Sequence, residues 1–308
     1  MNSAVRKFAL SIGFALIALF LIGFSGVVWG GLLYANFRTT SSIPWALPVL
    51  LVYLWLLWRY LAGFGWPYSP SSQRAALLRA YAVSPAYGWS MTAGLLAVFS
   101  LAGLWIVMFR LYPMEPNPLI PTSFTSSPIF VAAIVVGAAL LAPISEESAV
   151  RGYLQSILER NLAPFTAVLL SSAVFALAHA TQGLVWPKLL FYFLVGVAFG
   201  SLAYINQSIL PVIPVHIAGD LIFLTLIWPN DKNRMLIWKT GADSWFWLHV
   251  AQAIAFAALS LIALNQYPPQ SPQRRRLKLT YRWIFGPCTV CAQRAHVHLY
   301  IGLWDSIR

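Results

Sequence analysis

Residues 130–151 read FVAAIVVGAALLAPISEESAVR and contain the transition on which the fold depends. The run from Phe130 to Ala142 is apolar and ends at Pro143, just before the carboxylates Glu146 and Glu147. Apolar runs of about 20 residues are typical of helices that cross a membrane. A charged side chain at bilayer depth is costly and persists mainly where it faces a partner or a water-filled cavity. The stretch therefore predicts a membrane helix that leads into a polar site.

The composition of the whole chain is that of a polytopic membrane protein. Of its 308 residues, 59% are hydrophobic and 9% are charged, whereas soluble domains are about 45–50% apolar and about 25% charged. No soluble domain of ordinary size fits between the apolar segments. A large catalytic head outside the membrane is therefore excluded, and any chemistry must be done by the helices themselves.

We expect an all-α fold, a polytopic transmembrane helical bundle of about eight spans with an intramembrane polar cavity. A ninth span results if Glu146–Leu158 is a short membrane helix instead of an interfacial one. The positive-inside rule favours eight spans, because nine would place the basic end of the chain outside. The region Gly63–Ala82 predicts a polar loop with one short interfacial helix. The expected spans are Phe8–Tyr34, Pro44–Leu61, Met91–Leu111, a run that opens with Phe130–Ala142, Phe165–Ala180, Leu189–Ile205, Ile209–Trp228 and Trp245–Leu264.

The chain divides into an N-terminal transmembrane region (1–127), a catalytic transmembrane core (128–265) and a basic cytoplasmic tail (266–308). The tail holds seven basic residues and a single acid, Asp305. We interpret it as a positive-inside anchor near anionic headgroups, and we expect no nucleic-acid partner. Its pair Cys288 and Cys291 could form half of a zinc site with the two nearby histidines, but the spacing is not a standard one, and a solvated tail is the simpler interpretation.

The first polar motif is EESAVRGYLQ, residues 146–155. Residues four apart share a helix face, so Glu147 should lie over Arg151 and be held ionised by it. Glu146 points about a quarter-turn away and is left free for a cavity. Pro143 should end one helix and favour the start of the next, which would place both acids near the positive end of a helix dipole. Taken alone, the motif is more typical of a solvated helix start after a membrane span.

A second motif is FALAH, in which Phe175 and His179 share a helix face. The turn signal between Asn161 and Pro164 lies midway between Glu146 and His179. In a simple helical hairpin these two side chains would therefore sit at the same height. A lone histidine in an apolar helix is more often a satisfied core residue, and the match in height favours a site.

The third motif is PVIPVHIAGD, which places His216 and Asp220 on one helix face. Pro211 and Pro214 disrupt the helix just before them, and irregular backbone at membrane depth is tolerated only against protein or a watery cavity. A proline-kinked helix with one buried His–Asp pair is the alternative for this motif alone.

In this order, Glu-Glu-x-x-x-Arg, Phe-x-x-x-His and His-x-x-x-Asn/Asp resemble the three motifs of the CPBP family of intramembrane proteases. That family includes the type II CAAX prenyl endopeptidases and bacteriocin-processing or self-immunity proteins. The resemblance runs from Glu146 to Asp220 and covers no more of the chain. It implies a catalytic set of Glu146, Glu147, Arg151, His179, His216 and Asp220. Asp220 stands where the family often has Asn, and its added negative charge would favour a bound cation.

These residues point to hydrolysis of a peptide bond by an activated water, without a covalent intermediate. Glu146 would be the general base and would later pass the proton to the leaving amine. His179 and His216 are either ligands of zinc or another divalent metal, or donors to the water and the oxyanion. Asp220 is a further ligand or fixes the tautomer of His216. The expected metal set is therefore Glu146, His179, His216 and Asp220, and the resemblance leans toward a metalloprotease.

Two other functions stay open. The polar residues could form the relay of an ion- or proton-coupled transporter, or the protein could be a catalytically silent immunity or scaffold factor. The clustering of all polar motifs in one consecutive stretch favours the protease, because transporters often show related halves. We expect an integral, multi-pass protein of the bacterial plasma membrane, with the lipid bilayer and a membrane-associated peptide or protein substrate as its partners.

Overall fold

Helices make up the fold in the computed structural model, which describes residues 3–40, 42–66, 68, 71–81, 87–117 and 127–266. The described residues contain no strand, so the predicted all-α class is confirmed. Residues 1–267 form one unit. The predicted basic tail, with Cys288 and Cys291, lies outside the described residues. The long helices are α1 (Ser3–Thr39), α2 (Ala46–Leu61), α4 (Tyr87–Leu111), α5 (Pro128–Glu146), α7 (Pro164–Ala178), α8 (Trp186–Asn206), α9 (Val212–Ile222) and α11 (Ser244–Gln266).

Shorter elements connect or extend these helices. They are α3 (Ser71–Leu78), the π-helix η2 (Glu147–Leu154), α6 (Gln155–Asn161), the 3-10 helix η3 (Ala180–Gln182), the π-helix η4 (Phe223–Ile227), the 3-10 helix η5 (Trp228–Asn233) and α10 (Ile237–Thr240). The short helix expected between Gly63 and Ala82 is α3.

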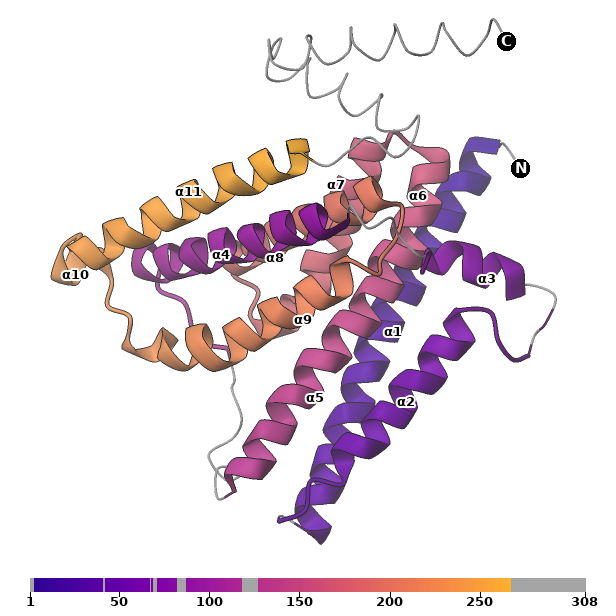
Figure 1. The fold of residues 1–308 in the computed structure, drawn as a ribbon, viewed down its shortest axis with the longest axis horizontal. Helices are drawn as coiled ribbons and strands as arrows, with labels where there is room; N and C mark the ends of the chain where they lie inside the picture. Colours follow the sequence, from indigo (N-terminus) through magenta and orange to yellow (C-terminus); the bar gives the residue numbers. More distant parts are fainter. Residues whose placement is uncertain are drawn as a thin grey trace, which may run out of the picture. The chain divides into compact units, whose positions relative to one another are not determined.

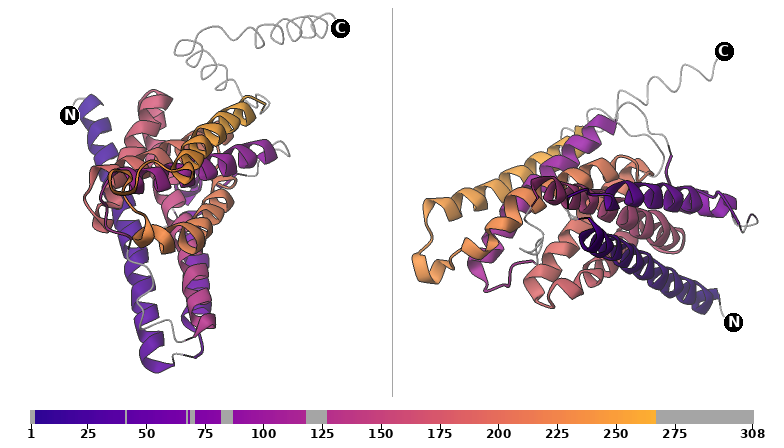
Figure 2. Two further views of the ribbon diagram at one scale, coloured as in Figure 1. Left: turned by 90° about the vertical axis from the view of Figure 1, so that its left-hand side faces the viewer. Right: turned by 90° about the horizontal axis from the view of Figure 1, so that it is seen from below.

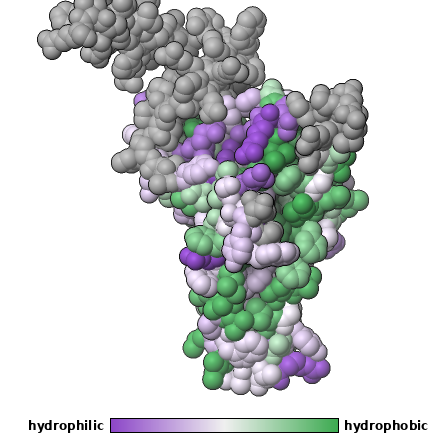
Figure 3. Space-filling model, turned by 90° about the vertical axis from the view of Figure 1, so that its right-hand side faces the viewer, coloured by the Kyte–Doolittle hydropathy of each residue, from purple (hydrophilic) through white to green (hydrophobic). Residues whose placement is uncertain are grey.

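Six helices in the described part of the chain are long and apolar enough to cross a membrane, and α2 and α7 are shorter apolar helices. Together they occupy the places of the eight predicted spans. Helix α5 lies along α1 and α2, whereas α4 lies along α11 and contacts α8 and α9 (Figure 1). Figure 2 shows these two groups of helices from two further directions. On the face drawn in Figure 3, hydrophobic side chains dominate the middle and hydrophilic ones gather toward the ends, as expected of helices in lipid.

The prediction that Pro143 separates two helices is wrong. Pro143 lies inside α5, and the helical backbone continues through η2 and α6, giving one apolar helix of 34 residues from Pro128 to Asn161. Proline removes one backbone donor, but a membrane helix tolerates this where neighbouring groups satisfy the freed atoms. Glu146 and Glu147 are therefore mid-helix residues without the expected help of a helix dipole, and Glu146–Leu158 is no separate ninth span.

The π-helix η2 follows directly after Glu146, and α3 packs against it. A π-helix shifts the backbone hydrogen bonds by one residue and frees a carbonyl group, a feature frequent at functional sites. Arg79 donates from Nη2 to the Arg151 carbonyl oxygen at 2.8 Å and pairs with Glu159 through Nη1. A Cβ atom at Gly152 would lie 3.1 Å from the Leu78 carbonyl oxygen, so α3 approaches this turn closely.

Helices α7 and α8 form a tight hairpin. A Cβ atom built at Gly196 would lie 2.7 Å from Cβ and 2.8 Å from Cα of Ser172, closer than real contacts allow. The missing side chain lets the two backbones approach, which brings the end of α7 beside the first turns of α8.

This contact generates a stability prediction. We expect Gly196→Ala to lower the free energy of unfolding by about 1–3 kcal/mol, because the new methyl group overpacks the α7–α8 contact. Gly26→Ala on α1, where a Cβ atom would meet nothing within 4 Å, is the matched control. It should raise stability by about 0.5–1 kcal/mol through helix propensity alone. Thermal unfolding of the wild type and both purified variants in one detergent measures the two effects. A melting temperature of Gly196→Ala equal to that of the wild type would contradict the tight contact.

Candidate functional site

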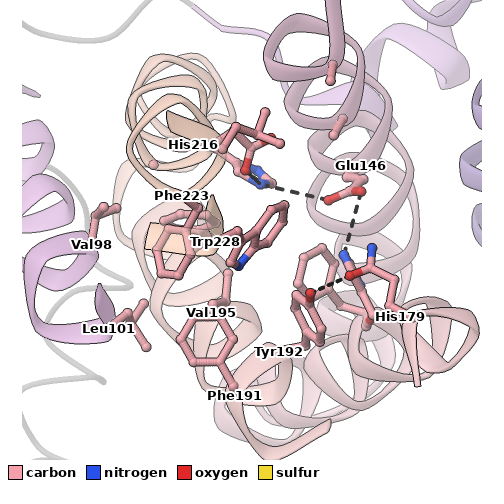
Figure 4. A pocket seen from close by; sticks show the side chains of 18 residues that line it. Val98, Leu101, Glu146, His179, Phe191, Tyr192, Val195, His216, Phe223 and Trp228 are labelled. Atoms are coloured by element: carbon pink, nitrogen blue, oxygen red, sulfur yellow. Dashed lines mark hydrogen bonds and ion pairs between the residues drawn. The ribbon is translucent and has the colours of Figure 1, made fainter. Parts of the chain in front are cut away.

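Glu146 is buried at the end of α5 and faces a cavity of about 220 Å³. Apolar side chains from α4, α5, α7, α8, η4 and η5 line most of this cavity, among them Val98, Leu101, Phe191, Phe223 and Trp228. Its polar wall consists of Glu146, His179, Gln182, His216 and Asp220. Figure 4 shows Glu146, His179 and His216 pointing toward one another across the cavity. The predicted division of the acids is confirmed in its geometry, since Glu147 points elsewhere.

His179 is held in one orientation by its own helix. It follows the last residue of α7, and its Nδ1 lies 2.9 Å from the Phe175 carbonyl oxygen. A carbonyl oxygen can only accept, so Nδ1 carries the proton and donates it. The Nε2 atom is thereby left facing Glu146, 3.9 Å from its Oε1. The hairpin prediction that these two residues share one height is confirmed.

His216 is oriented by a carboxylate from another helix. Its Nδ1 donates to Oε1 of Glu147 at 2.7 Å, which leaves Nε2 3.8 Å from Oε2 of Glu146 and 3.5 Å from Oδ1 of Asp220. The sequence left two roles open for Asp220, a further metal ligand or the group that fixes the tautomer of His216. The structure gives that position to Glu147 and places Asp220 on the Nε2 side, facing the cavity. Both imidazoles therefore present Nε2 to Glu146.

Arg151 supports this arrangement from behind. It is fully buried, and its Nη1 lies 3.2 Å from Oε1 of Glu147, as the spacing of four predicted. Its guanidinium carbon lies 4.2 Å from the ring centre of Phe175 and 5.8 Å from that of Phe199. Phe175 also packs on His179, with ring centres 4.6 Å apart. Phe175 of the second motif thus packs against both Arg151 of the first motif and His179 of its own motif.

Three residues of the site were missed by sequence reasoning. Phe199 packs on His216 with ring centres 4.7 Å apart, and Tyr192 stacks on His179 at 3.9 Å. Gln182 lines the cavity and accepts a hydrogen bond from the Tyr192 hydroxyl. All three lie in or just before α8, outside every polar motif. An aromatic residue in an apolar helix is indistinguishable from ordinary core, so the sequence carries no signal for Tyr192 and Phe199.

The donors of the site are of the kinds that bind a divalent metal, namely imidazole nitrogens and carboxylate oxygens. As arranged, however, no group of three or more His, Cys, Asp or Glu side chains in the described ranges could hold a metal ion. The metal expected from the sequence therefore stays a prediction without structural support, and no step below depends on it.

The separations suit a water-mediated reaction. Distances of 3.8 and 3.9 Å between Glu146 oxygens and the two Nε2 atoms are too long for direct hydrogen bonds. One water molecule can bridge polar groups at such separations. The arrangement can thus hold a water against a carboxylate base, with two imidazoles on either side of the reacting atoms.

A comparison with protein families finds one match. Residues 128–222 match the family described as type II CAAX prenyl endopeptidase Rce1-like. The matched segment is less than half of the chain, but it runs from α5 to the end of α9 and contains all six predicted site residues. No curated protein and no solved structure matches the chain.

The buried pair behind the cavity generates a second stability prediction. We expect Arg151→Met to destabilise the protein by about 3–5 kcal/mol, because it leaves the Glu147 carboxylate buried without its cation. The double variant Glu147→Gln/Arg151→Met removes both charges and should recover a large part of that loss. Denaturant unfolding of the wild type, both single variants and the double variant gives the coupling energy. Additive effects would show that the two side chains do not stabilise each other.

Proposed function

Because residues 128–222 of this chain belong to the type II CAAX prenyl endopeptidase Rce1-like family, we propose that the protein hydrolyses a peptide bond of a membrane-associated protein or peptide by means of an activated water. The family is one of proteases, and the chain is an integral, multi-pass membrane protein. One observation carries the proposed mechanism: Glu146 and the Nε2 atoms of two oriented histidines converge in a single buried cavity. The bacterial plasma membrane stays the predicted location.

The first step is the activation of water. Glu146 accepts a proton from a water that also donates a hydrogen bond to Nε2 of His179. The hydroxide attacks the carbonyl carbon of the scissile bond, and the carbonyl oxygen becomes an oxyanion. Proton transfer to a positioned carboxylate contributes typically about 10²–10⁴-fold to a rate.

His216 is the better placed of the two imidazoles to stabilise the oxyanion. Glu147 holds its Nδ1, and its Nε2 lies toward Glu146 and Asp220 in the cavity, where the oxyanion would form. A doubly protonated His216 donates from Nδ1 to Glu147 and from Nε2 to the oxyanion. When the C–N bond breaks, Glu146 returns its proton to the leaving amine, and the new carboxylic acid then loses its own proton to that amine or to water.

The general base generates the central prediction. We expect Glu146→Gln to lower kcat by about 10²–10⁴-fold, because the amide cannot accept the proton from water. Glu115→Gln, at an exposed glutamate in the loop after α4, is the matched control and should keep wild-type activity. Cleavage of a set of membrane-anchored peptides in detergent micelles, with prenylated CAAX peptides as the first probes, is followed by mass spectrometry.

Glu146→Gln and its control Glu115→Gln also distinguish a protease from a scaffold factor and from a transporter. Full activity of Glu146→Gln would contradict the enzyme and favour an immunity or scaffold role. If wild-type protein cleaves nothing but conducts protons or cations in proteoliposomes, and Glu146→Gln abolishes that flux, the transporter is supported instead.

Metal dependence requires its own experiment. The sequence predicts a divalent metal on imidazole and carboxylate donors, so we expect 1,10-phenanthroline and EDTA to abolish cleavage and added zinc to restore it. Elemental analysis and activity before and after dialysis against chelator measure this. Activity that survives complete removal of metal would contradict the predicted ligand set of Glu146, His179, His216 and Asp220.

A further inference from the structure

Tyr192 covers one face of the His179 ring. The two ring centres are 3.9 Å apart with an angle of 20° between the planes, a closely stacked pair. Phe175 packs on the same imidazole from its own helix. Figure 4 shows Tyr192 beside His179 at the edge of the cavity opposite His216. The imidazole is therefore confined by two aromatic rings and by its Nδ1 hydrogen bond.

The Tyr192 hydroxyl belongs to a buried polar network. It donates to Oε1 of Gln182 and accepts from Nδ2 of Asn117 at 3.2 Å. Lys188 Nζ donates to Oδ1 of Asn117 at 2.8 Å and to the Gln182 carbonyl oxygen at 3.0 Å. Tyr192, Asn117 and Lys188 are 5%, 4% and 2% exposed. The network thus joins the loop after α4, the turn η3 and the start of α8 directly beside His179.

Stability does not account for Lys188. A buried ammonium group is costly to desolvate, and its place in the first turn of α8 puts it at the positive end of a helix dipole. Its two hydrogen-bond acceptors are neutral, and the carboxylates of Asp231 and Glu115 act on its charge through space. A leucine or methionine would fill the same space without the cost. What the lysine does is fix the Gln182 backbone and the Asn117 side chain, the two groups that surround the Tyr192 hydroxyl.

We propose that Tyr192 is a positioning residue for His179, and that Lys188 and Asn117 act through it. The stacked ring prevents the imidazole from rotating about its side-chain bonds. The hydroxyl network prevents the tyrosine itself from moving away. His179 follows the last residue of α7 and leads into η3, so the stacked tyrosine is a second support, beside the Nδ1 hydrogen bond, that keeps Nε2 aimed at Glu146. The catalytic importance of this aim rests on the proposed function.

The test uses two variants of Tyr192 in the full-length protein. Tyr192→Phe keeps the stacked ring and removes the hydroxyl, and Tyr192→Leu removes both. Tyr53→Phe is the matched control, because its hydroxyl bonds Ser25 between α1 and α2, outside the cavity lining. We expect Tyr192→Phe to lower kcat about fivefold with KM unchanged. Tyr192→Leu should lower kcat about tenfold further.

A second readout does not depend on activity. Diethyl pyrocarbonate acylates unprotonated imidazole nitrogens, and the labelled peptide that contains His179 can be quantified by mass spectrometry. We expect labelling of His179 to be several times faster in Tyr192→Leu than in wild type. His249 is an internal reference, since its Nδ1 makes the same bond to a carbonyl four residues earlier, that of Trp245, at 2.8 Å, on a helix away from the cavity. Its labelling should not change.

The outcomes are distinct. Unchanged kcat and unchanged His179 labelling in both Tyr192 variants would overturn the positioning role. A parallel loss of kcat and of melting temperature in Tyr53→Phe would assign the effect to stability and would overturn it too. If Tyr192→Leu does not fold, Tyr192→Phe alone decides. Full activity of His179→Gln would contradict the proposed function, whereas faster labelling of His179 in Tyr192→Leu would still support the tyrosine's hold on the ring.

Discussion

Oε1 of Glu147 lies 2.7 Å from Nδ1 of His216 and 3.2 Å from Nη1 of Arg151, in a position fully shielded from solvent. A buried carboxylate without partners would be too costly to keep ionised, so the residues around it must compensate its charge. Arg151 supplies the compensating cation from one turn further along the helix. His216 arrives from α9 and is oriented by the same oxygen. Because the Glu147 carboxylate is bound to Arg151 and His216 behind the cavity wall, the acid that faces the cavity is its neighbour Glu146.

The distinction between the two adjacent acids depends on backbone geometry as well as on pairing. Glu146 ends α5, and Glu147 begins the π-helix η2. The looser π turn is stabilised from outside by Arg79, which donates to the Arg151 carbonyl oxygen. Arg79, from the region expected at the membrane interface, thus supports the helical turn that carries the Glu147–Arg151 ion pair. Glu147 is thus paired with Arg151 and His216 behind the cavity wall, and Glu146 faces the cavity.

Local relations within one helix could be predicted from the sequence. A spacing of four residues placed Glu147 at Arg151, Phe175 at His179 and His216 near Asp220, because helix geometry alone decides these contacts. The helical class and the places of the apolar helices followed from hydrophobic run lengths. The rule that proline ends a helix failed at Pro143, where the tertiary environment overrides a local preference.

Contacts between helices could not be predicted in the same way. The bond from His216 to Glu147 and the stack of Tyr192 on His179 depend on how α8 and α9 pack against α5 and α7. That packing is set by close approaches such as Gly196 against Ser172. The sequence does not indicate which neighbouring helix a glycine in a membrane helix packs against. Tyr192 and Phe199 belong to the site only because α8 lies where it does.

The unbroken helix from Pro128 to Asn161 also determines how deep the acid lies. Its 34 residues extend about 50 Å at about 1.5 Å each, against a hydrocarbon thickness of about 30 Å. Glu146 is the last of the 19 residues of α5, about 28 Å from the start. An upright helix that enters the hydrocarbon at Pro128 therefore delivers this carboxylate to the far headgroup layer. Under the proposed function, the reacting water has only a short way to travel, and a substrate anchored in that leaflet by a lipid would meet Glu146 without leaving the membrane.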